Sequence, residues 1–423
     1  MNIGKDINKK KLFNSSSKEQ HIIDDVPYVG QKNSIFCSYA CQTMIFKYYN
    51  LNIDLDDLVF NSGIGYSLSY SKDYKNYFPI GGTLLSQWPL DRKFVAGLYG
   101  LEFETWFPTD LSCSIHEIWN VYWKKIKEYV KKDIPVSTGV DLVSLPAFRD
   151  LMNYNSWTNT KKIPNFAWKL ISTAHEIVIV GFDEEKKLVY YNDPVALVLG
   201  KREEGIYASA PLDVFARAVA NAKIGNFNPK FIINTYKKNK SPLSDEIIFK
   251  KSHDRNIQKL KGNPLSYDEK WRKYPLGIDA LNAIIKDFEM MHKKKNNDLL
   301  ASYKLGSFKN ALMKKIPKFF MKKSSPLIID DTFATFYEII SIEKKHAYKY
   351  IENKSINLKG LRDEIELLEQ ELEKWEAISK FYSRFYKEFI LSTKNNKVKK
   401  INENLISNIL EIINIEKRIT EIY

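Results

Sequence analysis

The sequence feature that most constrains this chain is a cysteine at the start of an apolar helix, preceded six positions earlier by a glutamine. The glutamine is Gln31, and Cys37 opens a segment that is apolar from residue 40 to residue 49. Far along the chain, His175 heads the apolar segment 176–182. In this order and on these elements, the three residues predict a thiol-catalytic site.

The chemistry needs each of these residue types. A thiol near its ordinary pKa is a weak nucleophile, and both the positive end of a helix and a neighbouring imidazolium favour the thiolate. We therefore predict Cys37 as the nucleophile and His175 as the general base. The side-chain amide of Gln31 can donate a hydrogen bond to an oxyanion, and we predict that role for it.

A further group is expected to orient the histidine. After a short turn, the segment 188–191 leads back to Asn192, Asp193 and Pro194. Strand pairing would bring His175 and Asp193 to neighbouring ends of one hairpin, so we predict that Asp193 fixes the tautomer of the imidazole. Asn192 is the rival orienter, because an amide can play the same part.

The other cysteines and histidines fit structural roles. Cys41 lies four residues after Cys37 on one helix face and is predicted to be a small buried residue. Cys113 and His116 lie at a helix start with serine or aspartate caps, and two ligands are too few for a zinc site, so no metal is expected. The remaining histidines are predicted to be surface or packing residues: His21, His253, His292 and His346.

Composition bounds the class of protein. With 423 residues, of which 44% are hydrophobic, the chain can bury a large core and is expected to form two domains. Three cysteines argue against a disulfide framework and fit a reducing compartment. The first twenty residues are polar and lysine-rich, and no run approaches the roughly twenty apolar residues that span a bilayer. We therefore expect a soluble, cytoplasmic protein without a signal peptide.

The chain is basic, with 65 Lys+Arg against 51 Asp+Glu and a formal net charge of +14. Runs of lysine usually belong to solvated faces. The sequence lacks the interleaved aromatic residues or recognition-helix pattern that would indicate nucleic-acid binding, so nucleic acid is not expected as a partner. The interpretation we favour is an acidic protein partner that is attracted by a basic face.

The order of predicted elements indicates an α+β fold. Helices are predicted at 37–49, 55–60, 114–129 and 212–222, and strands at 134–140, 176–182, 188–191 and 230–236. We divide the chain into a polar tail at 1–25, a catalytic domain at 26–236, a linker at 237–245 and a helical domain at 246–423. Leucines among glutamates at 364–373 predict a packed helix or a short coiled coil, which offers a surface for a homodimer.

The order Gln, Cys, His, Asp resembles the arrangement in papain-like cysteine enzymes, and several stretches resemble the acyltransferase family of butirosin biosynthesis (BtrH-type). This resemblance implies a papain-like catalytic domain with an antiparallel sheet, a helical C-terminal region and a place for Asp141 in the substrate pocket. The segment 147–172 has no match in that family. The stretches that carry the resemblance are 37–40, 63–70, Val140-Asp141 with Leu145-Pro146, 175–183, Asn192-Asp193 and 277–287.

The resemblance implies that an acyl group moves from a carrier-protein thioester to Cys37 and then to a small-molecule amine, as an amide-forming step of antibiotic biosynthesis. The donor would be a phosphopantetheine thioester on an acyl or peptidyl carrier protein, with no bound cofactor and no membrane.

Two alternatives to this function stay open. The segment 26–31 looks closer to bacterial peptidases that trim bacteriocin leader peptides, which would make the chain a cysteine peptidase, and a non-catalytic binding protein could use the same fold.

Overall fold

The structure is a computed structural model of the chain. Cys113, the segment 147–172 and the side chain of His292 lie outside the residues that it describes. The described residues are 19–32, 36–71, 78–85, 89–108, 114–145, 174–198, 200, 202–222, 230–294, 336–355, 361–391 and 395–423.

The chain forms two compact units. Of the described residues, the first unit holds 19–55 and 100–240, and the second holds 56–99 together with those beyond 240. Residues 56–99 group with the helical part. Their packing gives the reason, because Phe60 and Tyr66 share a core with Ile257 and Ile351. The linear domain boundaries expected from the sequence stay a prediction.

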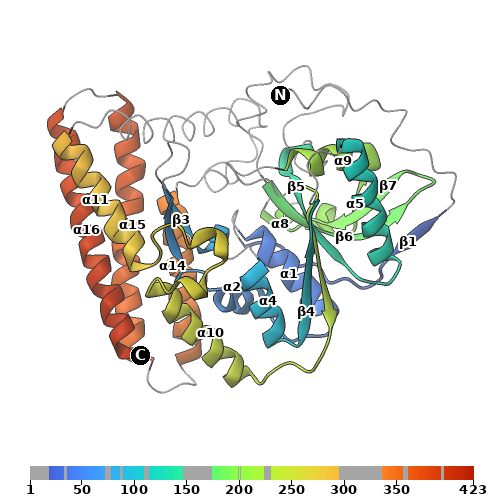
Figure 1. Cartoon of the computed structure of the whole chain (residues 1–423), viewed down its shortest axis with the longest axis horizontal. Helices are drawn as coiled ribbons and strands as arrows, with labels where there is room; N and C mark the ends of the chain where they lie inside the picture. The colour runs from blue at the N-terminus through green and yellow to red at the C-terminus, as the bar shows by residue number, and fades with distance from the viewer. Residues whose placement is uncertain are drawn as a thin grey trace. The chain divides into compact units, whose positions relative to one another are not determined.

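In the described part of the first unit, an antiparallel sheet of seven strands carries the fold, in the order β4-β9-β5-β6-β7-β8 with β1 paired to β6 (Figure 1). Residues 20–22, expected in a polar tail, form β1 and pair with residues 181–183. The strand expected at 230–236 begins later, at Ile233. The strands are β1 (Gln20–Ile22), β4 (Leu101–Trp106), β5 (Val136–Asp141), β6 (Ala174–Asp183), β7 (Leu188–Asn192), β8 (Ala208–Pro211) and β9 (Ile233–Lys238).

Helices cover both faces of this sheet. The ring of Phe46 in α1 lies 5.2 Å from that of Tyr236 in β9, whereas Tyr122 in α5 hydrogen-bonds at 2.7 Å to Thr138 in β5. Because β5 and β9 pair at Ser137–Asn234 and side chains alternate along a strand, these two contacts lie on opposite faces. The helices of this unit are α1 (Cys37–Tyr48), α5 (Ile115–Val130), α8 (Val195–Val198) and α9 (Leu212–Asn221), with short 3-10 turns η2 (Leu142–Ser144) and η4 (Arg202–Gly205).

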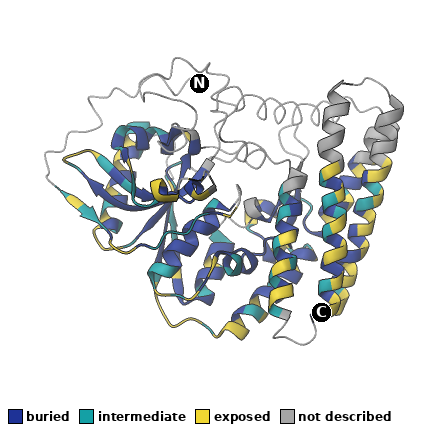
Figure 2. Cartoon of the chain, turned by 180° about the vertical axis from the view of Figure 1, so that it is seen from behind, coloured by how far each residue is buried: buried dark blue, intermediate teal, exposed yellow. Residues whose placement is uncertain are grey.

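Helix α1 is buried along most of its length, from Ser38 to Phe46. Two of its polar side chains hydrogen-bond within the unit: Thr43 Oγ1 donates to the Tyr39 carbonyl at 2.8 Å, and Cys41 Sγ donates to the Glu176 carbonyl of β6 at 3.2 Å. The buried interior appears dark blue in Figure 2. Because α1 packs directly on β6, its first residue is held at a fixed place beside that strand.

The second unit is mainly helical, and the α+β architecture with a helical C-terminal region is thereby confirmed. Its core combines Leu68 and Tyr70 of β2 with Trp375 of α15. Gly81 ends β3 and Gly82 begins α3, so this strand leads directly into the helix. The elements are α2 (Leu55–Asn61), β2 (Leu68–Ser71), β3 (Phe78–Gly81), α3 (Gly82–Leu85), α4 (Pro89–Leu98), α10 (Asp245–Leu260), η5 (Pro264–Ser266), η6 (Glu269–Trp271), α11 (Ile278–Lys294), α14 (Phe336–Ser355), α15 (Arg362–Leu391) and α16 (Asn395–Ile422).

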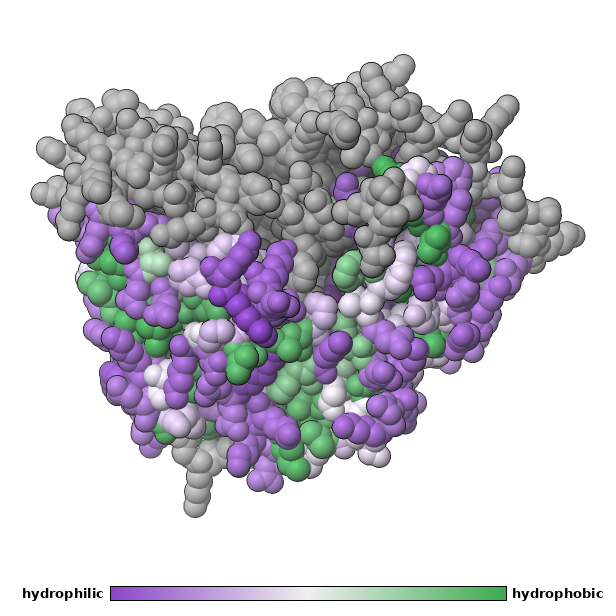
Figure 3. Space-filling model, viewed as in Figure 1, coloured by the Kyte–Doolittle hydropathy of each residue, from purple (hydrophilic) through white to green (hydrophobic). Residues whose placement is uncertain are grey.

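The surface of the described residues is mixed in character. Hydrophilic residues predominate on the face drawn in Figure 3, with smaller hydrophobic areas between them. None of the helices in the described ranges has the length and apolar character needed to cross a membrane.

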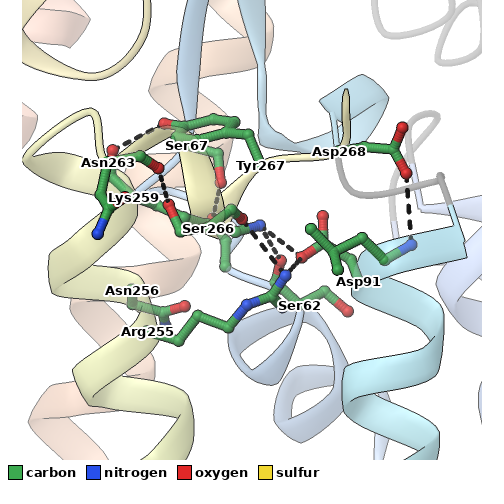
Figure 4. Close-up of polar contacts among 12 residues, drawn as sticks. Ser62, Ser67, Asp91, Arg255, Asn256, Lys259, Asn263, Ser266, Tyr267 and Asp268 are labelled. Atoms are coloured by element: carbon green, nitrogen blue, oxygen red, sulfur yellow. Dashed lines mark hydrogen bonds and ion pairs between the residues drawn. The ribbon is translucent and has the colours of Figure 1, made fainter. Parts of the chain in front are cut away.

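A buried ion cluster joins α4 to α10 in the second unit (Figure 4). Asp91 Oδ1 lies 2.8 Å from Lys259 Nζ and 2.5 Å from Arg255 Nη2. Lys259 Nζ also donates to the Ser62 carbonyl at 3.0 Å, just beyond the end of α2. Burial lowers the pKa of Lys259 to about 8, and the carboxylate of Asp91 opposes that shift. The Asp91 charge therefore compensates two cations, one of them completely buried.

We predict that Asp91→Asn strongly destabilises the protein. The amide keeps the shape of the side chain but removes the negative charge beside Lys259 and Arg255, and breaking a buried ion pair costs about 3–5 kcal/mol. The midpoint of urea unfolding measures the loss. Asp254→Asn, an exposed change on the same helix α10, is the control and should leave the midpoint nearly unchanged. Equal midpoints for the two variants would show that the cluster contributes little.

Candidate active site

The candidate nucleophile Cys37 is the first residue of α1. The preceding residue, Phe36, makes no side-chain cap to the helix. The backbone N–H groups of the first turn therefore leave a positive end beside the thiol. Cys37 is partly exposed, whereas Cys41 is fully buried. Of these two thiols, only Cys37 is open to a substrate.

His175 stands beside Cys37 at the start of β6. In the sheet it pairs with Val140 of β5. Its Nε2 lies 2.7 Å from Asp193 Oδ1, and its ring also hydrogen-bonds to the Cys37 side chain. Because Nε2 faces the carboxylate, Nδ1 is the ring nitrogen left for the thiol. The structure thus brings together the three residues that the sequence predicted as nucleophile, base and orienter.

The electrostatics of this group favour a protonated imidazole. Burial alone lowers the pKa of His175, but the Asp193 carboxylate and Cys37 raise it by more, from 6.5 to about 10. Both side chains of the ion pair are buried, at 3% and 1% exposure, so their attraction is little screened by water.

The sheet register decides which residue meets the histidine. Asn192 is the last residue of β7 and pairs with Val178, so Asp193 follows immediately after the strand. The side chain of Asn192 is engaged elsewhere: Nδ2 donates to the Val26 carbonyl at 3.3 Å, and Oδ1 accepts from the Tyr207 N–H at 2.8 Å. The geometry thus pairs His175 with Asp193, while the orienting role of Asp193 stays a prediction.

Gln31 precedes Cys37 in the chain, and Asp141 lies between Cys37 and His175. Gln31 is 1% exposed, and its backbone N–H donates to the Pro194 carbonyl at 3.0 Å, which holds it next to the Asp193 loop. Asp141 ends β5 opposite Ala174 and accepts a hydrogen bond from Ser144 at 2.6 Å. The oxyanion role of Gln31 and the pocket role of Asp141 stay predictions.

The remaining cysteines and histidines form no metal centre in the described ranges, which hold no suitable group of three His, Cys, Asp or Glu residues. His116 lies near the start of α5, where Ser114 and Glu117 form a capping box, and contacts Asn120 at 3.0 Å. His253 is a buried packing residue on Glu364 at 2.8 Å. His21 and His346 lie near Asp133 and Asp56, at 2.8 and 3.7 Å respectively.

The sequence reasoning missed one residue of this neighbourhood. Tyr28 donates its hydroxyl to the Asp193 carbonyl at 3.0 Å. The signal that could have pointed to it is its place in the segment 26–31, only three residues before Gln31.

We predict that iodoacetamide labels Cys37 before the other cysteines, because its thiol is partly exposed and adjoins the His175 imidazolium. Cys37→Ala should abolish rapid labelling, as measured by intact mass and peptide mapping. Cys41→Ala and Cys113→Ala are the controls and should keep it. Faster labelling at Cys41 or Cys113 would contradict the assignment.

We predict that Asp193→Asn lowers the pKa of His175, because the variant removes the carboxylate charge that raises it. A raised pKa stabilises the folded protein fully below pH 6.5, and this contribution is lost as the pH rises through about 10. The stability advantage of the wild type over the variant should therefore shrink across that window. NMR titration of the histidine ring nitrogens and urea unfolding at the two ends of the window measure both effects. Asp213→Asn, which disrupts an ion pair with Arg217 on α9, should leave the His175 titration unchanged.

Comparison with known proteins adds a family match. Residues 23–211 match the model of the Peptidase_C39 like family, over less than half of the chain. No curated protein matches the sequence. A solved structure from Bacillus anthracis, described as a candidate C39-like peptidase, aligns with a TM-score of 0.30 and 16% identity over 52% of this chain and 100% of that chain, a likeness too weak to carry an argument. The papain-like fold expected from the sequence is confirmed through the Peptidase_C39-like match over residues 23–211.

Proposed function

We propose that the chain is a cysteine-dependent acyltransferase in which Cys37 carries the acyl group as a thioester and an amine receives it. The observation that carries the proposal is the Cys37–His175–Asp193 arrangement: a partly exposed thiol at a helix start hydrogen-bonds to an imidazole whose Nε2 lies 2.7 Å from a buried carboxylate. These are the parts needed to form and resolve an acyl-enzyme.

In the first half-reaction the Cys37 thiolate attacks the carbonyl carbon of a donor thioester. The bond between the acyl carbon and the carrier sulfur breaks, and the departing thiolate takes the proton of the His175 imidazolium. Thioester is exchanged for thioester, so the step is near thermoneutral. The Gln31 amide is the candidate donor to the oxyanion formed during the exchange.

In the second half-reaction an amine attacks the acyl-enzyme. His175 accepts the proton that the amine loses, the bond between the acyl carbon and Cys37 Sγ breaks, and an amide is released. The thiolate and imidazolium are restored. Asp193 keeps the imidazole in one orientation through both halves and balances its positive charge.

Three features support an amine rather than water as the acceptor and a carrier protein as the donor. Short stretches of the sequence resemble the butirosin acyltransferase family, including the Asp141 and 277–287 segments. A large second unit, which peptide hydrolysis does not require, accompanies the catalytic residues. The net charge of +14 suits an acidic carrier protein bearing a phosphopantetheine thioester.

The second candidate function is that of a cysteine peptidase. The family match over residues 23–211 favours it, because that family is described as similar to C39 peptidases. A peptidase would form the same acyl-enzyme on Cys37 but resolve it with water, and exclusion of water decides between the two outcomes.

We expect incubation with an acyl carrier-protein thioester to add the acyl mass to the wild-type protein and not to Cys37→Ala, as seen by intact mass spectrometry. Cys41→Ala is the matched control and should be acylated. Addition of an amine panel should discharge the acyl group as an amide faster than water does. Raised salt should slow use of the carrier donor more than use of a free small thioester, because attraction between charged faces is screened beyond about 8 Å at physiological ionic strength.

Two results would contradict the transferase proposal. Cleavage of an unactivated peptide by the wild type, with no amide formed from any amine and thioester offered together, would replace the transferase with the peptidase. Acylation that persists in Cys37→Ala would refute both.

A further inference from the structure

The segment before the nucleophile is fastened along the loop that carries Asp193. We call residues 23–31 the N-terminal strap. At its start, the Tyr207 hydroxyl donates to the Ile23 carbonyl at 2.9 Å and accepts from the Val26 N–H at 3.0 Å. At its end, the Gln31 N–H donates to the Pro194 carbonyl at 3.0 Å. The strap is therefore held by Tyr207 at its start and by Pro194 at its end.

Tyr28 lies in the middle of the strap and reaches Asp193 itself. Its hydroxyl donates to the Asp193 backbone carbonyl at 3.0 Å and accepts from the Leu197 N–H in α8. Burial and the nearby Asp193 charge raise the pKa of Tyr28, which keeps the hydroxyl protonated and able to donate. The Arg202 guanidinium lies 5.5 Å from the centre of the Tyr28 ring.

The carboxylate of Asp193 depends on this backbone support. Oδ1 accepts from both His175 Nε2 and the Val195 N–H, at 2.7 and 3.1 Å. Oδ2 is buried and has no hydrogen-bond partner among the described residues. With one oxygen carrying both bonds, the direction of the carboxylate is set largely by where the backbone of residue 193 is held. Tyr28 is the strap residue whose side chain hydrogen-bonds to that backbone.

The packing around this point leaves little room for movement. A Cβ on Gly205 would lie 2.6 Å from the Asp193 carbonyl oxygen and 3.1 Å from the Tyr28 hydroxyl. The Asp193 N–H donates to the Gly205 carbonyl at 2.8 Å. The Asp193 backbone is thus held at its N–H by the Gly205 carbonyl and at its carbonyl by the Tyr28 hydroxyl.

We propose that Tyr28 is a positioning residue for the Cys37 site: its hydroxyl fixes the backbone of Asp193 and thereby the hydrogen bond that orients and charges His175. The inference rests on the proposed function only for its effect on acyl transfer, and its effect on His175 can be measured without any substrate.

The test compares Tyr28→Phe with Tyr207→Phe. Each variant removes one hydroxyl that hydrogen-bonds between the strap and the segment after β7, but only that of Tyr28 contacts Asp193. NMR titration of the His175 ring nitrogens in the full chain should show the pKa of His175 lowered by about one pH unit in Tyr28→Phe, less than in Asp193→Asn, and unchanged in Tyr207→Phe. The rate of Cys37 acylation by a carrier thioester should fall about tenfold in Tyr28→Phe, with little change in the donor concentration needed.

The outcomes separate the possible failures. An unchanged His175 titration in Tyr28→Phe would overturn the proposal even if acylation slowed, and equal shifts in both variants would show that only the integrity of the strap matters. A wild type that accepts no thioester would refute the proposed function, while the titration would still judge Tyr28. Should Tyr28→Phe fail to fold, Gly205→Ala gives a second test, because the added Cβ would lie 2.5 Å from Ala196 Cβ and 2.6 Å from the Asp193 carbonyl oxygen and so displaces the Asp193 backbone. It should lower the pKa of His175 in the same way, and an unaltered titration in that variant would overturn the proposal.

Discussion

The packing of helix α1 against strand β6 is the constraint on which the site depends. From Ser38 to Phe46 the helix is buried, and the Cys41 thiol bonds to the backbone of β6. A helix buried along that length cannot rotate or slide without opening cavities or exposing polar atoms. Its first residue is consequently fixed against the first residues of β6, which is where Cys37 meets His175.

The second constraint is electrostatic. A buried histidine would ordinarily give up its proton, because burial disfavours the charged form. Here the Asp193 carboxylate outweighs burial, and the pair persists as two opposite charges away from water. Such a pair is effective only at short distance and in one geometry. The hydrogen bonds that converge on Asp193 from the strap, from α8 and from Gly205 supply that geometry.

The sequence predicted the chemistry of the site better than its support. The spacing of Gln31 and Cys37 and the hairpin from His175 to Asp193 could be read from local patterns, because short-range periodicity encodes helices and strands. The choice between Asp193 and Asn192 could not be made with certainty, since it depends on the register between β6 and β7. The part played by Tyr28 depends on a contact across 165 positions, which no local pattern encodes.

The same distinction holds for the fold. The helices at 37–48 and 115–130 were predicted from their apolar spacing, and the leucines at 367 and 368 are buried as expected. The edge strand β1 is only three residues long and polar, so its composition gives no strand signal. The burial of a charged residue such as Lys259 can be predicted only when its ionic partner is known, because a lysine in a sequence normally predicts a solvent-exposed position.

The interleaved order of the two units also bears on how the protein is made. A ribosome releases residues 56–99 long before it releases the helices beyond residue 240 that complete their core. Phe60 and Tyr66 therefore lack their core partners from α10 and α14 while the intervening chain is synthesised. Asp91 meets its cationic partners only once α10 has been synthesised, before the helices α14, α15 and α16 that complete the core of this unit.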